Sequence, residues 1–494
     1  MRKCLLSLIP LFFLTHLSAQ TLVLPGDFPD PSVVKSGDTY WATATTSNWA
    51  PLFPLLESKD LIHWQLRGHA FTELPSWADY YFWAPEISHD KDKFYIYYSA
   101  HKRDGNLCVA VASADKAEGP YTDHGPLMCQ EAGSIDAWPI RNKDGKLYLI
   151  WKEDGNSVKL PTSIWAMEMD EGRTKLIGEK KELFRNDASW EGNLVEGISM
   201  IQHGDYYYAF YAGAGCCGRA CSYGVGVARA KDVLGPWEKF ASNPITATND
   251  KWKCPGHGTP ISKDGKYYFL YHAYDKESNV YAGRQGVLSE FSFTPDGWIE
   301  FINGPGGDEP IQREIKDEFN GNELEDIWQW SVFAKPKFAV RDGKIQLMAS
   351  EEKSGSYLGT KTYTANYDAD VIIDTRASSS EAGLGLVGDE KNFIAATLEG
   401  NRLVVRKVES DKETVIESKR VSPGGKLYIR ATVSNGKDII FSYSSDEKKY
   451  TKVNENAVDG FFLPPWDRAV RVALISKGTS GTKGVFEEFA LKNQ

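Results

Sequence analysis

The segment KDGKLYLIWK (residues 143–152) joins a polar turn to a strand of alternating aromatic and aliphatic residues, and this pattern occurs four more times. The other copies are SGDTYWATAT (36–45), DKDKFYIYYSA (90–100), HGDYYYAFYA (203–212) and KDGKYYFLYHA (263–273). Each turn is rich in Asp and Gly, as tight hairpin turns require. Copies at a nearly regular interval indicate a repeat architecture with one supersecondary unit per copy.

A further strand is expected on each side of every copy. The strands before the copies are DPSVV (30–34), APEIS (84–88), DAWPIRN (136–142), EGISMIQ (196–202) and HGTPIS (257–262). The strands after them are PLLESKDLIHW (54–64), VAVASADKAEGPY (109–121), SIWAMEMDEG (163–172), VGVARAKDVLGPW (225–237) and VLSEFSFTPDGW (287–298). Five antiparallel units predict an all-β fold, a five-bladed β-propeller over residues 20–310. A series of β-sandwiches is the alternative, and the similarity of the copies argues against it.

The pattern changes after NGPGGDEP (303–310), which is typical of a linker. Short alternating strands such as KIQLMAS (344–350) and KLYIRATVS (426–434) then follow between polar turns. We expect a C-terminal β-sandwich domain over residues 314–494. A chain of 494 residues has ample length for two domains.

The first residues, MRKCLLSLIPLFFLTHLSAQ, have a basic start, an apolar run and an ending in small residues. This pattern predicts a signal peptide over residues 1–19, too short to span a membrane as a helix. No later apolar stretch is long enough to span, so we expect a soluble secreted or periplasmic protein. The net charge of −10 disfavours nucleic acid and anionic membranes as partners and favours a neutral substrate.

Six cysteines follow the predicted signal peptide: Cys108, Cys129, Cys216, Cys217, Cys221 and Cys254. In an oxidising compartment they are expected to form one or more disulfides, whose connectivity the sequence leaves open. A metal site built from CCGRAC (216–221) is the alternative. No histidine or second CxxC pair lies at the spacing of zinc ligands, which disfavours it.

The residues that open the five leading strands are expected to converge, because the first strand of each propeller blade lines the central channel. They are Asp30, Ala84 to Glu86, Asp136, Glu196 and His257. The blades align on Pro31, Pro85, Pro139 and Pro260, with Ser199 at this position in the fourth blade.

Three carboxylates in one pocket raise one another's pKa, so such clusters seldom serve structure alone. Sugar hydrolysis uses such a cluster, because one carboxylic acid protonates the leaving oxygen and a carboxylate acts at the anomeric centre. For any one of Asp30, Asp136 and Glu196 taken singly, a turn or strand-end cap is the structural alternative.

Five motifs in order, PGDFPDPS (25–32), WAPEI (83–87), SIDAWPI (134–140), VEGISM (195–200) and CPGHGTP (254–260), together resemble the family 43 glycoside hydrolases. The resemblance covers the whole predicted propeller. It implies a five-bladed propeller that hydrolyses arabinose, xylose or related linkages with inversion. One departure is Ile198, which stands where the family usually has proline after the acid.

The resemblance also implies roles by position. Asp30 matches the general base, Asp136 the residue that tunes the pKa of the acid, and Glu196 the general acid. His257 matches the axial histidine, which often helps to hold a calcium ion or water in the channel, and Arg284 matches an arginine near the acid and the substrate hydroxyls. No cofactor is required on this basis, with a structural Ca²⁺ as the one addition.

Aromatic residues near the motifs are candidate sugar platforms. They are Trp49, Phe53, Trp83 and Trp138, which follow or adjoin the strand openings. Core or inter-blade packing is the alternative for each of them. Trp83 is favoured, because it matches an aromatic residue of the family.

The C-terminal domain resembles the concanavalin-like sandwich of many exo-acting members, through DEFNGNELEDIWQW (317–330) and KGVFEEFALKN (483–493). ALISKGTSG (473–481) fits the pocket-closing loop of the xylosidase sandwiches poorly. The domain is therefore left as a sugar-binding module, a packing partner or a contributor to the site.

These observations favour a secreted, inverting exo-hydrolase of α-L-arabinofuranosyl or β-D-xylosyl residues in pentose-containing oligo- or polysaccharides. Within the same class, the alternatives are an endo-α-1,5-L-arabinanase and a galactofuranosidase- or galactanase-type hydrolase. A non-catalytic glycan-binding propeller is the alternative of another class, disfavoured because all three carboxylates are present. The oligomeric state is left open.

Overall fold

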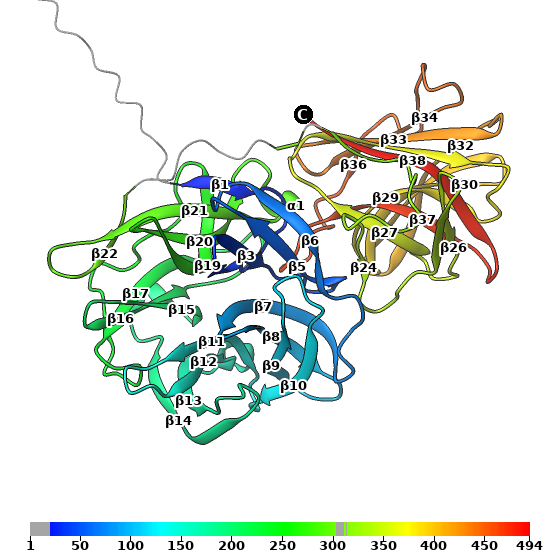
Figure 1. Cartoon of the computed structure of the whole chain (residues 1–494). Coiled ribbons are helices and arrows are strands. Elements are labelled where there is room, and N and C mark those ends of the chain that lie inside the picture. Colours follow the sequence, from blue (N-terminus) through cyan, green and yellow to red (C-terminus); the bar gives the residue numbers. More distant parts are fainter. Residues whose placement is uncertain (1–19, 303–310, 313) are drawn as a thin grey trace, which may run out of the picture.

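The computed structural model of the protein describes residues 20–302, 311–312 and 314–494, which form two all-β domains side by side (Figure 1). The predicted signal peptide (1–19) and the linker segment 303–310 lie outside the described residues. Among the described residues, no helix has the length and apolar character needed to cross a membrane.

Five antiparallel sheets form the first domain, and the first strand of each repeat lies at one edge of its sheet. The innermost strands are β2 (Ser32–Ser36), β7 (Ala78–Asp90), β11 (Ser134–Arg141), β15 (Val195–His203) and β19 (Trp252–Lys263). Each contacts the next, and β19 contacts β2, so that the ring is closed. The predicted β-propeller is therefore confirmed, with the leading strands around its axis.

The repeated aromatic segments form the second strands, which are β3 (Thr39–Thr43), β8 (Lys93–Lys102), β12 (Leu147–Glu153), β16 (Tyr206–Gly213) and β20 (Lys266–Asp275). The third strands are β5 (Leu52–Ser58), β9 (Leu107–Ala114), β13 (Ser163–Met169), β17 (Gly224–Ala230) and β21 (Arg284–Phe293). The outer strands are β6 (Trp64–Phe71), β10 (Thr122–Met128), β14 (Leu176–Arg185), β18 (Glu238–Lys239) and β22 (Ile299–Phe301). Short helical turns lie at Gly155–Val158, Ser189–Glu191 and α1 (Asn279–Ala282).

The ring is joined by a strand that the repeat pattern does not contain. Strand β1 (Thr21–Leu24) pairs antiparallel with β21 of the last blade, with Thr21 opposite Leu288. Its residues Leu22, Val23 and Leu24 are buried. The start of the described chain thus completes the sheet formed by its last propeller strands, which ties the first and fifth blades together.

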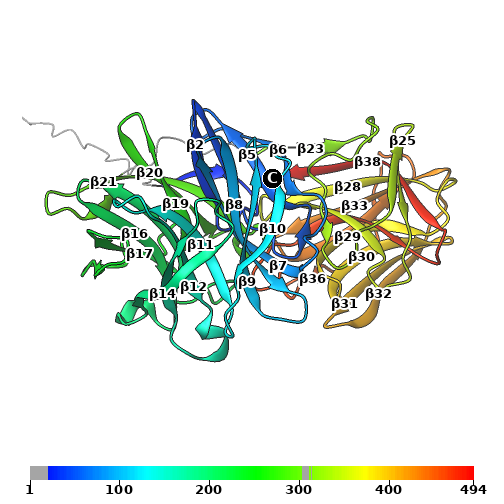
Figure 2. The same cartoon turned by 60° about the horizontal axis from the view of Figure 1, so that its bottom comes forward.

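The second domain consists mainly of two sheets, as predicted for a β-sandwich (Figure 2). The nine-stranded sheet contains β23 (Glu314–Asp317), β25 (Phe338–Arg341), β26 (Lys344–Met348), β28 (Tyr367–Asp374), β33 (Lys426–Ser434), β34 (Asp438–Ser444), β35 (Thr451–Lys452), β36 (Val458–Asp459) and β38 (Lys483–Asn493). The six-stranded sheet contains β27 (Ser356–Lys361), β29 (Glu381–Asp389), β30 (Asn392–Glu399), β31 (Arg402–Glu409), β32 (Lys412–Arg420) and β37 (Arg471–Lys477). Burial alternates strictly along β28, so one face of this strand points into the core.

The two domains share backbone pairing and a continuous core. Strand β4 (Trp49–Ala50), in the first blade, pairs with β24 (Trp330–Ser331) of the second domain. One buried apolar cluster includes side chains from both domains. A buried ion pair joins Asp27 to Arg471 at 3.1 Å. The sandwich therefore packs directly against the first blades of the propeller.

Candidate active site

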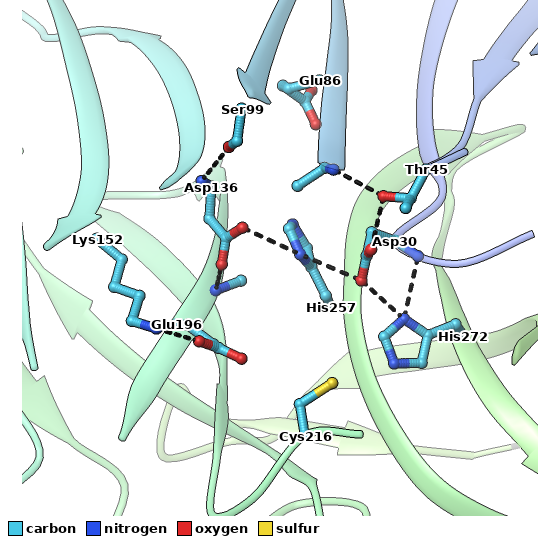
Figure 3. Close-up of polar contacts among 12 residues, drawn as sticks. Asp30, Thr45, Glu86, Ser99, Asp136, Lys152, Glu196, Cys216, His257 and His272 are labelled. Atoms are coloured by element: carbon cyan, nitrogen blue, oxygen red, sulfur yellow. Dashed lines mark hydrogen bonds and ion pairs between the residues drawn. The ribbon is translucent and has the colours of Figure 1, made fainter. Parts of the chain in front are cut away.

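A cavity of about 320 Å³ lies where the innermost strands open around the axis. This volume is near the lower end of the roughly 300–1,000 Å³ range of small-molecule sites. Asp30, Asp136, Glu196, His257 and Arg284 all line it, so the structure brings together the residues expected to converge. Figure 3 shows Asp30 on one side of the site and Asp136 with Glu196 on the other, with His257 between the two sides.

Asp30 is held by groups that favour its ionised form. Its Oδ1 lies 3.1 Å from Nη1 of Arg284, and its Oδ2 accepts a hydrogen bond of 2.7 Å from the Thr45 hydroxyl. Burial raises the pKa of this carboxyl, but the Arg284 guanidinium and the His272 ring lower it by more, so the pKa lies well below its usual range. Asp30 is therefore held in its ionised form.

Glu196 lies opposite, in a setting that favours its protonated form. Burial raises its pKa to about 6, and the charge of Asp136 adds to this rise, while Lys152 lowers it. The Lys152 ammonium donates to Oε2 of Glu196, and the Tyr223 hydroxyl donates to Oε1. The two carboxyls thus have pKa values moved in opposite directions, which is the mark of an acid and base pair.

Asp136 lies on the same side of the site as Glu196 and is hydrogen-bonded to strand β15, which carries Glu196. Its Oδ2 accepts a hydrogen bond of 2.8 Å from the backbone N–H of Gly197. Burial raises the pKa of Asp136, partly opposed by His257 and Lys152. Gly197 has φ +61°, and a Cβ there would come within 2.8 Å of the His257 ring. Glycine is therefore required next to Glu196.

His257 links the two aspartates across the axis. Its Nδ1 lies 3.6 Å from Oδ1 of Asp30 and 3.9 Å from Oδ1 of Asp136. Among the described residues, no group of three or more His, Cys, Asp or Glu side chains is placed to hold a metal ion. These side chains therefore do not form a metal site by themselves, and the structural Ca²⁺ stays a prediction.

Three of the second strands, and the residues just after β3, supply partners that were not predicted from the sequence. Counted from the hairpin turns, Thr45, Ser99, Lys152 and His272 occupy equivalent positions near the ends of the repeated aromatic segments. Each contacts the residue that opens the next blade: Thr45 accepts from Ala84 N, Ser99 from Asp136 N and His272 from Asp30 N, while Lys152 donates to Glu196. The sequence did contain a signal for these partners. In four of the five repeated segments, the tenth residue is polar, although most of the segment after the turn is apolar.

Lys152 is the most unusual of these partners. It is fully buried, and its Nζ also lies 2.7 Å from Oδ1 of Asp154. Burial lowers the pKa of this ammonium, but Glu196, Asp154 and Asp136 raise it by more, so it stays charged. A charged lysine in this position fixes the Glu196 carboxyl and limits how far burial raises the pKa of Glu196.

Of the four predicted aromatic platforms, only Trp83 lines the cavity. The interpretation of the other three was wrong. Trp49 is buried against Tyr357 of the sandwich, with ring centroids 6.2 Å apart, and Phe53 is buried among Phe71, Phe82 and Tyr98 of the propeller core. Trp138 packs against the core cluster between the third and fourth blades. The packing alternative holds for all three, because their rings fill spaces between blades or domains.

The sandwich domain contributes directly to the cavity, through Trp466 and Asp467. Asp467 is 1% exposed, and its Oδ2 accepts hydrogen bonds from Nε1 of Trp83 at 3.2 Å and from the Ser47 hydroxyl. Its backbone carbonyl accepts from Nη2 of Arg284 at 3.0 Å. These residues precede β37, so the loop before ALISKGTSG, and not that segment, reaches the site.

The cysteines pair as Cys108–Cys129, Cys216–Cys217 and Cys221–Cys254. The disulfide expectation is therefore confirmed. The metal-binding alternative for CCGRAC is wrong, because all three of its cysteines are in disulfides. Cys216 and Cys217 line the cavity beside Arg284, whose Nη1 lies 3.9 Å from Sγ of Cys216.

Comparison with known proteins places this site in a family. Residues 19–299 match glycosyl hydrolases family 43, and residues 316–464 match the beta xylosidase C-terminal concanavalin A-like domain. Xylosidase/arabinosidase 43B of Humicola insolens is 25% identical over 486 aligned residues, which cover 87% of this chain and 88% of the relative. Non-reducing end alpha-L-arabinofuranosidase BoGH43B of Bacteroides ovatus is 25% identical over 83% of this chain and 82% of its own length.

The solved structures agree on the fold. The GH43 BlXynB protein from Bacillus licheniformis superposes with a TM-score of 0.82 at 23% identity, over 96% of this chain and all of that one. Its likeness therefore extends over both domains. With the family match covering more than half of the sequence, the chain belongs to glycosyl hydrolase family 43 and is a glycoside hydrolase.

Proposed function

We propose that the enzyme is an inverting exo-hydrolase that releases terminal α-L-arabinofuranosyl or β-D-xylosyl residues from pentose-containing oligo- or polysaccharides. The observation that carries this proposal is the pair of carboxyls whose pKa values are moved apart, Asp30 downward and Glu196 up to about 6. One group is thus ionised and the other can carry a proton at the same mildly acidic pH.

In the proposed reaction, Glu196 gives its proton to the glycosidic oxygen as the bond to the anomeric carbon breaks. Asp30 takes a proton from a water molecule, whose oxygen attacks the anomeric carbon from the opposite face of the ring. The sugar leaves with inverted configuration, and the two protons moved by the carboxyls return through solvent. Asp136 is a positioning residue, which holds the Gly197 backbone and influences the pKa of Glu196.

Exo action is favoured by the shape of the site and by its relatives. The cavity is small, and Trp466 and Asp467 of the sandwich form part of its wall. An extended chain bound in mid-length would need an open groove across this wall. The relatives named as xylosidase/arabinosidase and non-reducing end arabinofuranosidase align over both domains. An endo-arabinanase relative from Bacillus subtilis aligns over 51% of this chain.

Export from the cytoplasm belongs to the same proposal, and it rests on the signal-peptide pattern of residues 1–19. A secreted or periplasmic hydrolase would meet polysaccharide fragments outside the cytoplasm. N-terminal sequencing of the protein recovered from its host would test this, with cleavage after residue 19 as the expected result.

The activity is tested with nitrophenyl α-L-arabinofuranoside and β-D-xyloside beside the corresponding galactosides, arabinan and xylan. We expect hydrolysis of at least one pentoside, with NMR showing inversion of the anomeric configuration. Glu196→Gln and Asp30→Asn should each lower kcat by about 10³-fold or more, since each removes a proton-transfer group worth roughly 10²–10⁴-fold and disturbs its partner.

Glu153→Gln is the matched control. Glu153 lies next to Lys152 on β12, but its carboxylate accepts a hydrogen bond from Trp165 and does not line the cavity. This variant should keep most of the activity. Retention of configuration, or full activity of either site variant, would contradict the proposed mechanism.

A further inference from the structure

An unbroken series of aromatic rings leads out of the cavity along the seam between the two domains. Its members, here called the aromatic track, are Trp466, Trp83, Tyr81, Tyr80 and Phe333. Successive ring centroids are 5.8, 4.4, 4.7 and 6.0 Å apart. The first three rings line the cavity, and the last two lie beyond its lining.

The backbone of β7 is shaped to present three of these rings close together. In a regular strand Tyr80 and Tyr81 would point to opposite faces. The pairing of β7 with β8 is irregular between Ala78 and Tyr80, between Tyr80 and Trp83, and between Trp83 and Glu86. Tyr81 has φ +57°, which is rare for a bulky residue and marks a constrained site. Bulges of this kind redirect side chains near active sites.

The two ends of the track come from the sandwich and are open to solvent. Trp466 is 51% exposed and Phe333 is 56% exposed. Phe333 directly follows the interdomain pairing of β4 with β24, and the neighbouring Val332 N–H donates to the backbone carbonyl of Asn48. Both domains thus fix the track, and neither domain alone contains all of it.

Beyond Phe333 the surface continues into a hollow of about 950 Å³ in the sandwich. Its lining includes Lys353, Glu390 and Asp411, which can donate and accept hydrogen bonds, together with Phe333 itself. Ring faces flanked by hydrogen-bonding side chains suit a chain of neutral sugars, whose rings have apolar faces and hydroxyl edges.

We propose that the aromatic track binds the part of an oligosaccharide chain that remains outside the cavity when its terminal residue is cleaved. This inference rests on the proposed function and makes it more specific: the preferred substrate is a chain of several sugars, and the sandwich takes part in binding it. The cavity identifies the occupant, because Tyr81, Trp83 and Trp466 of the track also line the cavity and Trp466 is half exposed there.

The test compares kcat/KM for a nitrophenyl pentoside with kcat/KM for linear oligosaccharides of two to six residues of the same sugar. In the wild type, kcat/KM should rise with chain length. In Tyr80→Ala/Phe333→Ala this rise should be lost through a higher KM for the long chains. An aromatic contact of ordinary strength corresponds to roughly 2- to 10-fold per ring, so the loss of two rings should lower the ratio of kcat/KM for long chains to kcat/KM for short chains by about 4- to 100-fold.

Phe293→Ala is the matched control. Phe293 is partly buried and stacks on His203 at 3.7 Å, much as Tyr80 stacks on His101 at 4.1 Å, but it lies in the fifth blade and outside the track. In Phe293→Ala, the ratio of kcat/KM for long chains to kcat/KM for short chains should equal that of the wild type. An unchanged ratio in the double variant, or an equal loss in Phe293→Ala, would overturn the proposal.

A second measurement separates this proposal from the proposed function. Arabinohexaose and xylohexaose are titrated by calorimetry into Glu196→Gln, with and without the two track substitutions. Weaker binding of either hexaose by the track variant supports the track even if the wild type hydrolyses no pentoside. Equal binding by both proteins, or no binding by either, refutes it.

Discussion

At the scale of single residues, the carboxylates of the site could be predicted from the sequence, whereas most of their hydrogen-bonding partners could not. Asp30, Asp136 and Glu196 could be found because each opens a repeated strand near a fixed marker position. Tyr223 lies between two strands of the fourth blade, and Asp467 comes from the other domain. No spacing in the sequence connects these two to the site, because tertiary packing alone brings them there.

The charge of Lys152 should affect how kcat/KM depends on pH, because it acts on the pKa of Glu196. Glu196 must be protonated to act, so kcat/KM should fall as the pH rises through its pKa of about 6. The Lys152 ammonium lowers this pKa, and Lys152→Met removes that charge. The pKa of Glu196 should therefore rise, and the descending limb of the pH profile should move to higher pH, with a lower maximal rate.

Lys146→Met is the control for this charge change. Lys146 lies at the other end of the same repeated segment, where it is exposed and paired with Glu168 at 2.7 Å. Its pH profile should overlay that of the wild type. A descending limb that stays in place in Lys152→Met, or moves to lower pH, would show that Lys152 does not control the acid.

At the scale of elements, the repeat predicted the second strands well, because their turns and alternation are local features. Whether an aromatic residue is buried or open is not set by the sequence around it. Trp49 and Trp83 are both tryptophans near strand openings, yet Trp49 is covered by Tyr357 of the sandwich whereas Trp83 faces the cavity. Which of the two tryptophans stays exposed to the cavity depends on where the second domain packs, and the composition of the sequence does not indicate that position.

Strand β1 also lies outside the repeat, and its burial makes the closure of the ring testable. Its three apolar residues are buried, and it pairs with β21 at the seam between the last and first blades. Val23→Asp would bury a carboxylate in the apolar cluster there, which costs several kcal/mol unless the charge is neutralised. We expect a lower melting temperature by calorimetry, by roughly 5 °C or more.

Thr39→Asp serves as the comparison for Val23→Asp. Thr39 begins β3 in the neighbouring blade and is partly exposed. The same charge placed there should change the melting temperature by no more than about 2 °C, since exposed substitutions usually stay within ±0.5 kcal/mol. Equal shifts in the two variants would mean that β1 does not tie the ring together.

At the scale of the whole molecule, the sandwich could be predicted as a domain, but its role could not. The alternating strands of residues 314–494 are a local pattern, while the contact between Asp467 and Trp83 joins residues far apart in the chain. The structure selects the third of the three roles left open, because Trp466 and Asp467 line the catalytic cavity. The propeller supplies the carboxyls of the cavity, and the sandwich completes the wall around them.

Because the sandwich forms part of the cavity wall, the substitution Asp467→Ala in the full-length protein should affect activity. The substitution removes the carboxylate that accepts hydrogen bonds from Trp83 and Ser47. The buried Ser47 hydroxyl loses its acceptor, and Trp83 Nε1 keeps only its hydrogen bond of 3.1 Å to the Ser47 hydroxyl oxygen. An unsatisfied buried group costs about 1–3 kcal/mol, so Trp83 should lose its fixed orientation. We expect kcat/KM for a nitrophenyl pentoside to fall by about 10-fold, mainly through a higher KM, with both domains still folded by circular dichroism.

Glu455→Ala makes the same change of charge on the sandwich but at an exposed position, where Glu455 pairs only loosely with Lys419 at 3.6 Å. Its kinetics should match those of the wild type. If Asp467→Ala also matched the wild type, Trp83 would be held by the propeller alone and the sandwich would be only a packing partner. A loss confined to Asp467→Ala would instead mean that neither domain has a complete active site, which accounts for backbone pairing and a shared core at their junction.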